Sequence, residues 1–262
     1  MVPTVRRPAV AGSFYPADPG QLETGLRRYL AESEPIDLDF ALRILIVPHA
    51  GYIYSGPVAA TGYRVLNGVT ELRRAVMLGP SHYERFPGLA LPGVDAMATP
   101  LGDVTIDSDA VGEIAADPIV IDSATAHQRE HSLEVQLPFL QIVAPDVPIV
   151  PLLTGDVDAA EVADVVEALL DDDMVLLVSS DLSHYHSAAV ARGLDAATAA
   201  SIERRKPEEL NRESACGRTG VQAALHIARR RGWKVQTLDL RNSSDTAGPA
   251  DRVVGYGTFA IG

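Results

Sequence analysis

The sequence has a single cysteine and lacks any long apolar run. A membrane-spanning helix needs roughly 18 consecutive apolar residues, so the sequence argues against a transmembrane segment. Residues 1–18 carry charges but show no continuous apolar stretch ahead of a cleavage site, which a secretory signal would need. A cytoplasmic protein is therefore the expectation. An internal disulfide is excluded, which leaves Cys216 as a small core residue, a nucleophile or a metal ligand.

Positive charge is also scarce. The chain has 22 Lys and Arg against 35 Asp and Glu, which gives a formal net charge of −13. Such a surface repels nucleic acid and anionic lipid, so neither is expected as a partner. Hydrophobic residues make up 47% of the 262 positions, the balance of an ordinary globular protein. Because no internal repeat, low-complexity tract or linker interrupts the chain, residues 1–262 are predicted to form one domain.

Short runs that are apolar at almost every position indicate strands covered on both faces, as in parallel sheets. Such runs are found at 42–47, 75–78, 149–153 and 174–178. Helical patterns are found at 21–30, 57–66, 109–116, 133–143, 159–170, 188–202 and 217–231. The alternation predicts an α/β fold, a three-layer sandwich in which helices cover both faces of a mostly parallel central sheet.

Other segments show less regular patterns. The Gly- and Pro-rich segment 86–107 indicates a hairpin-like excursion. Residues 234–241 and 253–261 predict two further strands, with a polar loop between them. The apolar stretch 138–142 fits either the core or an interface between copies of the chain, so a homo-oligomer stays an open alternative.

Histidines follow three of the four apolar runs. His49 follows the first run, His82 follows the second, and His184 and His186 follow the last together with Asp181. In open α/β sheets, ligands bind beyond the carboxyl ends of the strands. These side chains are therefore expected to converge on one cleft.

The two strand-end histidines suit a metal ion, because neutral imidazole binds iron, copper and zinc. His49 and His82 with one further donor would make a three-ligand site with open positions, as catalysis at a metal requires. In the alternative interpretation, each histidine only hydrogen-bonds to loop backbone. The matching positions of His49 and His82 on two predicted strands favour the metal site.

Cys216 is the candidate for the further donor. It stands in the stretch ESACGRTG, just ahead of a helical pattern. A helix N-terminus lowers the pKa of a thiol and so favours the thiolate, the form that binds metals. The alternative, a buried small hydrophobe, fits the polar neighbours of Cys216 less well.

The stretch AHQREHSLEVQLPFL places His127 and His131 four residues apart. One helix through both would put them on one face, where they could hold zinc. The pattern is not HExxH, however, and Ser132 followed by Glu134 is typical of a helix start. We therefore predict that His131 and Glu130 line the cleft, rather than that the two histidines form a separate metal pair.

Tyrosines accompany the strand-end histidines. Tyr52 and Tyr54 follow His49, and Tyr83 follows His82. Their rings could bracket an aromatic or phenolic substrate and their hydroxyls could bind it. Half-buried packing with solvated hydroxyls is an equally good interpretation of these residues.

Six motifs occur in the order PHAGYIYSG, LGPSHY, TPLGD, EHSLEVQLPFL, SSDLSHY and CGRTG. Together with AGSFYPAD near the N-terminus, they make nearly the whole chain resemble the Memo family. The match is to its bacterial and archaeal members, protein B of the AmmeMemoRadiSam system. The resemblance implies a fold similar to the catalytic subunits of class III extradiol dioxygenases. It also implies a radical-SAM protein as a partner.

The resemblance puts the metal ligands of the family on His49, His82 and Cys216, and it puts Asp181 and His184 in the same pocket. The dioxygenases of this fold hold non-haem Fe(II) with two histidines and a carboxylate. A thiolate is softer than a carboxylate and shifts metal preference toward copper or zinc. The expected cofactor is therefore Fe(II) or copper, with zinc as a further candidate.

The leading hypothesis is a dioxygenase-like, metal-dependent oxidoreductase with a small-molecule substrate. His184 would move a proton, Asp181 would fix the tautomer of His184, and His131 would act beside them. The alternative is a binding or redox-partner protein that holds a metal, a peptide or a small acid in the same pocket without turnover. Hydrolysis by a Ser–His or Cys–His dyad is disfavoured because the sequence has no GxSxG motif.

Overall fold

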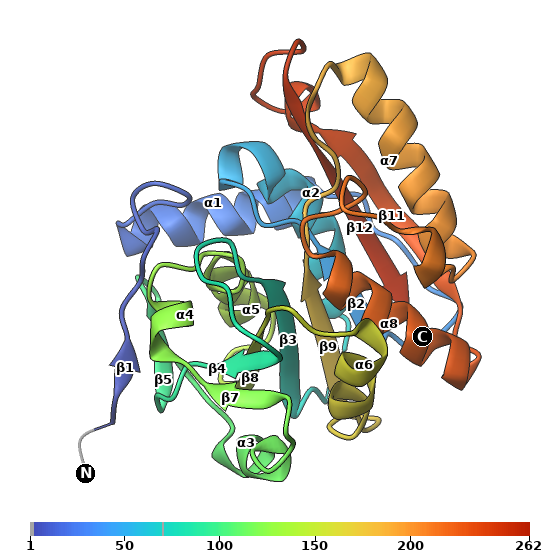
Figure 1. Cartoon of the computed structure of the whole chain (residues 1–262). Coiled ribbons are helices and arrows are strands. Elements are labelled where there is room, and N and C mark those ends of the chain that lie inside the picture. Colours follow the sequence, from blue (N-terminus) through green and yellow to red (C-terminus); the bar gives the residue numbers. More distant parts are fainter. Residues whose placement is uncertain (1–2, 70) are drawn as a thin grey trace.

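The structure is a computed structural model that describes residues 3–69 and 71–262. Within this part of the chain, a nine-stranded sheet has the order β10-β12-β2-β9-β3-β8-β4-β7, with β11 paired to β12 (Figure 1). The middle of the sheet is parallel. It consists of β2 (Ile44–Val47), β9 (Met174–Ser179), β3 (Arg74–Pro80) and β8 (Ile149–Thr154).

The borders of the sheet contain its antiparallel pairs. β12 (Val253–Ile261) runs antiparallel to β2, and β11 (Val235–Asn242) and β10 (His184–His186) run antiparallel to β12. On the other side, β4 (Leu89–Leu91) is antiparallel to β8 and parallel to β7 (Val120–Asp122). The predicted mostly parallel sheet is confirmed. The strands β7 and β10 were not predicted, because three residues carry too short a pattern.

Helices cover both faces of the sheet, as predicted. One face packs against α1 (Pro19–Glu32), α2 (Tyr52–Leu66) and α5 (Leu137–Val143). The other face packs against α3 (Ser108–Ile114), α6 (Ala159–Glu167), α7 (Ala188–Glu203) and α8 (Arg218–Arg231).

The alternation of side chains along a strand explains why the central runs are apolar throughout. Ile44 and Ile46 pack with the α6 and α8 layer, whereas Leu45 and Val47 pack with the α1 and α2 layer. Successive side chains of a strand point to opposite faces, so a strand between two helix layers needs an apolar residue at every position.

The predicted helices differ from the observed ones mainly at prolines. α2 begins at Tyr52, before the predicted start, and continues through Pro57. The predicted helix 133–143 is a 3₁₀ turn, η1 (Glu134–Gln136), followed by α5, which has Pro138 in its first turn. Proline is compatible with the first turn because the N–H groups there have no helical partner. Residues of α5 such as Phe139 are buried in the core, which favours the core interpretation of this stretch over an interface.

Shorter elements complete the chain. The excursion predicted at 86–107 contains β4 and a hairpin of β5 (Ala96–Thr99) and β6 (Gly102–Thr105), to which β1 (Val5–Arg6) adds a third strand. The remaining short helices are α4 (Ala124–Gln128), η2 (Pro207–Glu209) and η3 (Ser243–Asp245). None of the helices in the described part of the chain has the length and apolar character that crossing a bilayer requires.

A buried ion pair ties the N-terminal segment to the start of η1. The Glu134 carboxylate is 2.7 Å from Arg6 Nη1, and it also accepts hydrogen bonds from the backbone N–H groups of Ala9 and Val10 and from the Tyr15 hydroxyl. We call these five residues the N-terminal clamp. Both oxygens of Glu134 are occupied by protein donors, so the clamp fixes the loop that precedes η1.

Candidate metal centre

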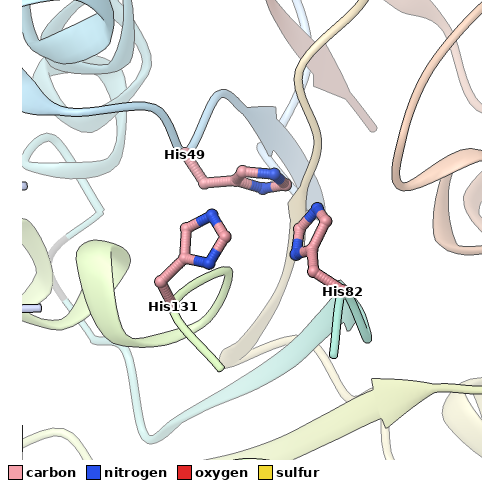
Figure 2. Close-up of side chains that lie close together, drawn as sticks. All are labelled: His49, His82 and His131. Carbon is pink, nitrogen blue, oxygen red and sulfur yellow. The ribbon is translucent and has the colours of Figure 1, made fainter. Parts of the chain in front are cut away.

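Three histidine rings meet at the carboxyl edge of the central strands (Figure 2). His49 comes two residues after β2, His82 comes two residues after β3, and His131 lies just before η1. The ring centroids are 5.2 Å apart for His49 and His82, 5.5 Å for His49 and His131, and 4.7 Å for His82 and His131. Each ring offers one nitrogen, and the three nitrogens lie within 4.8 Å of one another.

The strand order explains how residues distant in the sequence come together. β9 lies between β2 and β3, so the ends of β2 and β3 are about 10 Å apart. His49 and His82 therefore reach toward each other across the end of β9. The third ring arrives from the loop between α4 and η1, which packs over the α1 and α2 face of the sheet.

His49 is buried and held in one orientation. Its backbone N–H donates to Asp181 Oδ1 at 2.7 Å, and its Nδ1 lies 2.9 Å from Ser179 Oγ. The Ser179 hydroxyl donates its own proton to the Ser132 carbonyl, at 2.5 Å, so it must accept from His49. Nδ1 therefore carries the proton, and Nε2 presents its lone pair to a metal.

His82 is held in the same way by a carboxylate. Its backbone N–H donates to Glu130 Oε2 at 2.6 Å, and its Nδ1 lies 2.9 Å from Glu130 Oε1. Burial acts to raise the pKa of Glu130, but the bonds and charge of His82 and the Ser132 N–H outweigh it and lower the pKa to about 2. Glu130 is thus an ionised acceptor, and Nε2 of His82 is left for a metal.

His131 supplies the third nitrogen. Its buried Nδ1 lies 3.2 Å from Glu130 Oε1 but makes no hydrogen bond among the described residues. A buried nitrogen without a partner is costly, so the protein alone does not fully satisfy this imidazole. Burial and the neighbouring His49 lower the pKa of His131 to about 4, and burial and His82 lower that of His49 to about 3. Both rings are neutral at pH 7, the form that binds metals. These donors fit a transition-metal ion.

Cys216 lies beside the histidines, at the start of α8. Its Sγ is 3.2 Å from His49 Nε2 and accepts the backbone N–H of Asp181 at 3.2 Å. The prediction of a lowered thiol pKa is wrong for the protein without a cation. Burial, followed by the charge of Asp181, raises the pKa of Cys216 to about 12. The position of Cys216 near the start of α8 does not outweigh the effect of burial on the thiol pKa. A bound cation would lower that pKa and favour the thiolate.

The predicted ligand set and the observed cluster share two members. His49 and His82 belong to both, whereas His131 was predicted to act in the cleft and Cys216 was predicted as the third ligand. In the structure, His131 completes the cluster of three, and Cys216 touches it at His49. The signal for His131 was its place in a loop ahead of a helix start, where a side chain is free to reach a strand edge.

Asp181 and His184 lie in the same region but are not bonded to each other as predicted. Asp181 is buried, burial raises its pKa, and its Oδ1 holds the His49 backbone. His184 Nδ1 lies 2.8 Å from the Leu182 carbonyl, which fixes the tautomer that Asp181 was expected to fix. The carbonyl accepts the Nδ1 proton, so Nε2 of His184 is left able to accept another proton.

The predicted substrate-binding tyrosines have different environments. The Tyr52 hydroxyl donates to the Val135 carbonyl at 2.6 Å, so it is engaged in packing. Tyr83 is 47% exposed, and its ring centroid lies 6.2 Å from that of His131 and 4.9 Å from the Arg129 guanidinium carbon. Tyr54 is half-buried in the first turn of α2. Tyr83 and Tyr54 are thus the two that remain free to meet a ligand.

The sequence analysis missed the residues that orient the candidate metal-binding histidines through hydrogen bonds on the side away from the candidate metal site. Ser179 accepts from His49 and also from Gln136 Nε2, which reaches the Pro48 carbonyl as well. His127, by contrast, is buried outside the cluster, and its Nε2 lies 2.8 Å from the Ala90 carbonyl. Only the fold brings Ser179 and Gln136 to the same imidazole.

A wide surface hollow of about 1160 Å³ lies at the opposite, amino edge of the sheet. Its lining includes Arg43 and Arg73, which are paired with Asp172 and Asp173 respectively. These charges already have partners, and none of the three clustered histidines lines this hollow. The chemistry of the donors therefore assigns the candidate site to the carboxyl edge.

Comparison with known sequences agrees with the motifs. The sequence model of the family described as Memo-like protein matches residues 6–260. The chain belongs to the Memo family. MEMO1 family proteins of Aquifex aeolicus and Saccharolobus solfataricus are 36% and 34% identical to it, each over 96% of this chain and 97% of the relative. A MEMO1 family protein of Archaeoglobus fulgidus is 34% identical over the same shares. This Memo-family chain therefore aligns with its relatives across the whole histidine cluster.

Proposed function

We propose that this Memo-family protein binds a transition-metal ion between His49, His82 and His131, and that it acts as a metal-dependent oxidoreductase on a small molecule. The observation that supports it most is the cluster of three ring nitrogens within 4.8 Å. Two of the rings are already oriented by hydrogen bonds at Nδ1, which leave Nε2 of His82 free and Nε2 of His49 beside the Cys216 sulfur. The Cys216 thiolate is proposed as a further donor, as in the predicted set of His49, His82 and Cys216.

The donor set narrows the choice of metal. Imidazole suits iron, copper and zinc, and a sulfur donor shifts preference toward copper and zinc. Fe(II) and copper are the proposed redox-active cofactors. When bound, the metal would supply redox and Lewis-acid chemistry at its open positions.

The protein side chains contribute positioning and proton transfer. Glu130 and Ser179 fix the rings of His82 and His49. His184, whose Nδ1 is engaged by Leu182, would accept a substrate proton at Nε2. Asp181 keeps the His49 backbone in place from its buried position.

The first test is metal content. Chelator-treated protein would be loaded anaerobically with Fe(II), Cu(I) or Zn(II), desalted, and measured by mass spectrometry for metal per chain. We expect about one ion per chain in the wild type and little in His49→Ala. His226→Ala, which removes a histidine of α8 outside the cluster, should keep the full amount. Loss in His131→Ala but not in Cys216→Ala would identify the third imidazole as the essential ligand.

The second test is turnover. The Fe(II)- and copper-loaded proteins would be mixed with O₂ and a panel of catechols and small hydroxy acids, and O₂ uptake would be recorded. O₂ uptake by the wild type that is lost in His184→Ala would support the oxidoreductase proposal. Full metal content with no O₂ uptake on any compound would end the oxidoreductase proposal and leave a metal-binding protein without turnover. Absence of metal in the wild type would end both.

A further inference from the structure

The described part of the chain has four buried tyrosines, and one of them differs from the others. The hydroxyl of Tyr15 donates to Glu134, that of Tyr52 to the Val135 carbonyl, and that of Tyr63 to Gln136. Tyr256 is 1% exposed as a residue, and its hydroxyl makes no hydrogen bond with any described residue, but the hydroxyl is not among the fully buried unpaired atoms and so keeps some exposure. The other three hydroxyls are used up by the protein, whereas the hydroxyl of Tyr256 is free to bind a ligand at the end of an otherwise buried side chain.

The register of the sheet places Tyr256 at the metal centre. β12 runs antiparallel to β2, and Phe259 pairs with Ile46. Because the two strands are antiparallel, Tyr256, three residues before Phe259, lies level with His49, three residues after Ile46. On the other side, the backbone N–H of Leu182 donates to the Gly255 carbonyl at 2.8 Å, so the segment with Asp181 lies against the same stretch of β12.

The side chain of Tyr256 lies on the same face of the sheet as the histidines. Thr258, two residues further along β12, donates to the Val58 carbonyl of α2, and side chains two apart share a face. Tyr256 therefore lies under the first turn of α2. Burial, followed by the charges of Asp181 and Tyr54, raises the pKa of its phenol, which is consistent with a hydroxyl near both residues.

Asp181 provides a second free polar atom at this place. Its Oδ1 accepts from the His49 backbone, while Oδ2 has no hydrogen bond among the described residues. A phenol is a donor and a carboxylate oxygen is an acceptor. The two groups thus present complementary hydrogen-bonding atoms beside His49.

We propose that the Tyr256 hydroxyl donates a hydrogen bond to an ionised oxygen of a small molecule held at the metal centre. Asp181 Oδ2 accepts from a neighbouring hydroxyl of the same molecule. The ligand class is a molecule with two adjacent oxygens, one ionised and one protonated, such as an α-hydroxy acid or a catechol monoanion. This inference rests on the proposed function, because the ligand is bound next to the metal.

The test uses the full chain loaded with Zn(II), which binds without redox turnover, and 4-nitrocatechol as a coloured probe. Metal content is measured first for each protein, and the probe is then titrated by visible absorption. A hydrogen bond to a charged oxygen predicts that Tyr256→Phe weakens probe binding about 10- to 100-fold with full metal content. Tyr15→Phe, which removes a buried hydroxyl from the clamp, is the matched control and should bind the probe as the wild type does.

A second arm extends the test to the α-hydroxy acids of the ligand class. Lactate would be tested as a competitor of the probe, and its inhibition constant should also weaken in Tyr256→Phe if the ionised oxygen is what the phenol binds. Unchanged probe affinity in Tyr256→Phe with full metal content would overturn the inference and leave the proposed function intact. Loss of metal in Tyr256→Phe would also overturn it, because the hydroxyl would then support the site rather than the ligand. Wild type without metal would instead refute the proposed function.

Discussion

The N-terminal clamp and the metal centre are built on two glutamates only four residues apart. Glu134 and Glu130 are both buried, at 0% and 3% exposure. Glu134 is paired with Arg6, whose guanidinium stays charged at any physiological pH. Among the described residues, the Glu130 carboxylate has no arginine or lysine partner and instead accepts from the Nδ1 and backbone N–H of His82. Two glutamates that are almost equally buried therefore have different roles.

The partner decides what each carboxylate does. In the clamp, every charge is balanced within the protein, so the arrangement fixes the chain and leaves nothing for a ligand. In the metal centre, the carboxylate orients an imidazole whose other nitrogen points toward the cluster. Replacement of Glu134 should therefore reduce stability, and replacement of Glu130 should reduce metal affinity.

The largest effect is expected for Glu134→Ala, which leaves Arg6 buried without its charge partner. Breaking a buried pair from one side costs about 3–5 kcal/mol, so the free energy of unfolding should fall by that amount. Urea unfolding of the metal-free protein measures it. Per-chain metal content at saturating metal should stay at the wild-type level. A variant that loses metal but keeps its stability would contradict the assignment of Glu134 to the fold.

An intermediate effect is expected for Glu130→Gln, which keeps the shape but removes the charged acceptor behind His82. Loss of such a hydrogen-bonded carboxylate typically weakens metal affinity about 10- to 100-fold. Competition with a coloured chelator measures the affinity. Glu208→Gln, a change at an exposed carboxylate of η2, is the control and should bind metal like the wild type. Equal metal affinity in the wild type and in both variants would show that Glu130 does not support metal binding.

The smallest effect concerns His127, which lies between the two regions, with its carbonyl accepting from Arg6 Nε at 2.7 Å. Burial lowers the pKa of His127 to about 4, against about 6.5 in the unfolded chain. The unfolded state therefore binds the extra proton first. This stability contribution is complete above pH 6.5 and is lost as the pH falls toward 4.

Replacement of His127 by glutamine removes this titration while it keeps a donor for the Ala90 carbonyl. Between pH 7 and pH 5, the wild type should lose about 1–2 kcal/mol more unfolding free energy than His127→Gln, by linkage. Urea unfolding with a chelator present at both pH values tests the difference. Parallel losses in the two proteins would show that His127 does not titrate in this range.

The sequence predicted the fold well where one residue pattern had one structural cause. The four apolar runs became the four parallel strands, because a strand between two helix layers must be apolar at every position. It also predicted that His49 and His82 meet, since carboxyl ends of parallel strands share an edge. The start of α2 was placed too late, because Pro57 was taken as a helix beginning although the helix continues through it.

Some residues have roles that the sequence did not reveal, because partners distant in the sequence determine these roles. Glu130 and Glu134 look alike in EHSLEVQL, and only Arg6, which lies 128 positions from Glu134, separates them. Likewise, Tyr256 is one of eight tyrosines, and its free hydroxyl is visible only when the partners of the other three buried phenols are known.

By itself, the sequence determined the layered α/β architecture, the Memo family and the strand-end position of two imidazoles, because these depend on local periodicity and on motifs. The tertiary structure decided that His131 completes the cluster and that burial raises the Cys216 pKa. It also decided that Leu182, rather than Asp181, sets the tautomer of His184. Protonation and ligation depend on which groups lie within a few ångströms and on how much water is excluded, and both are settled only when the chain is folded.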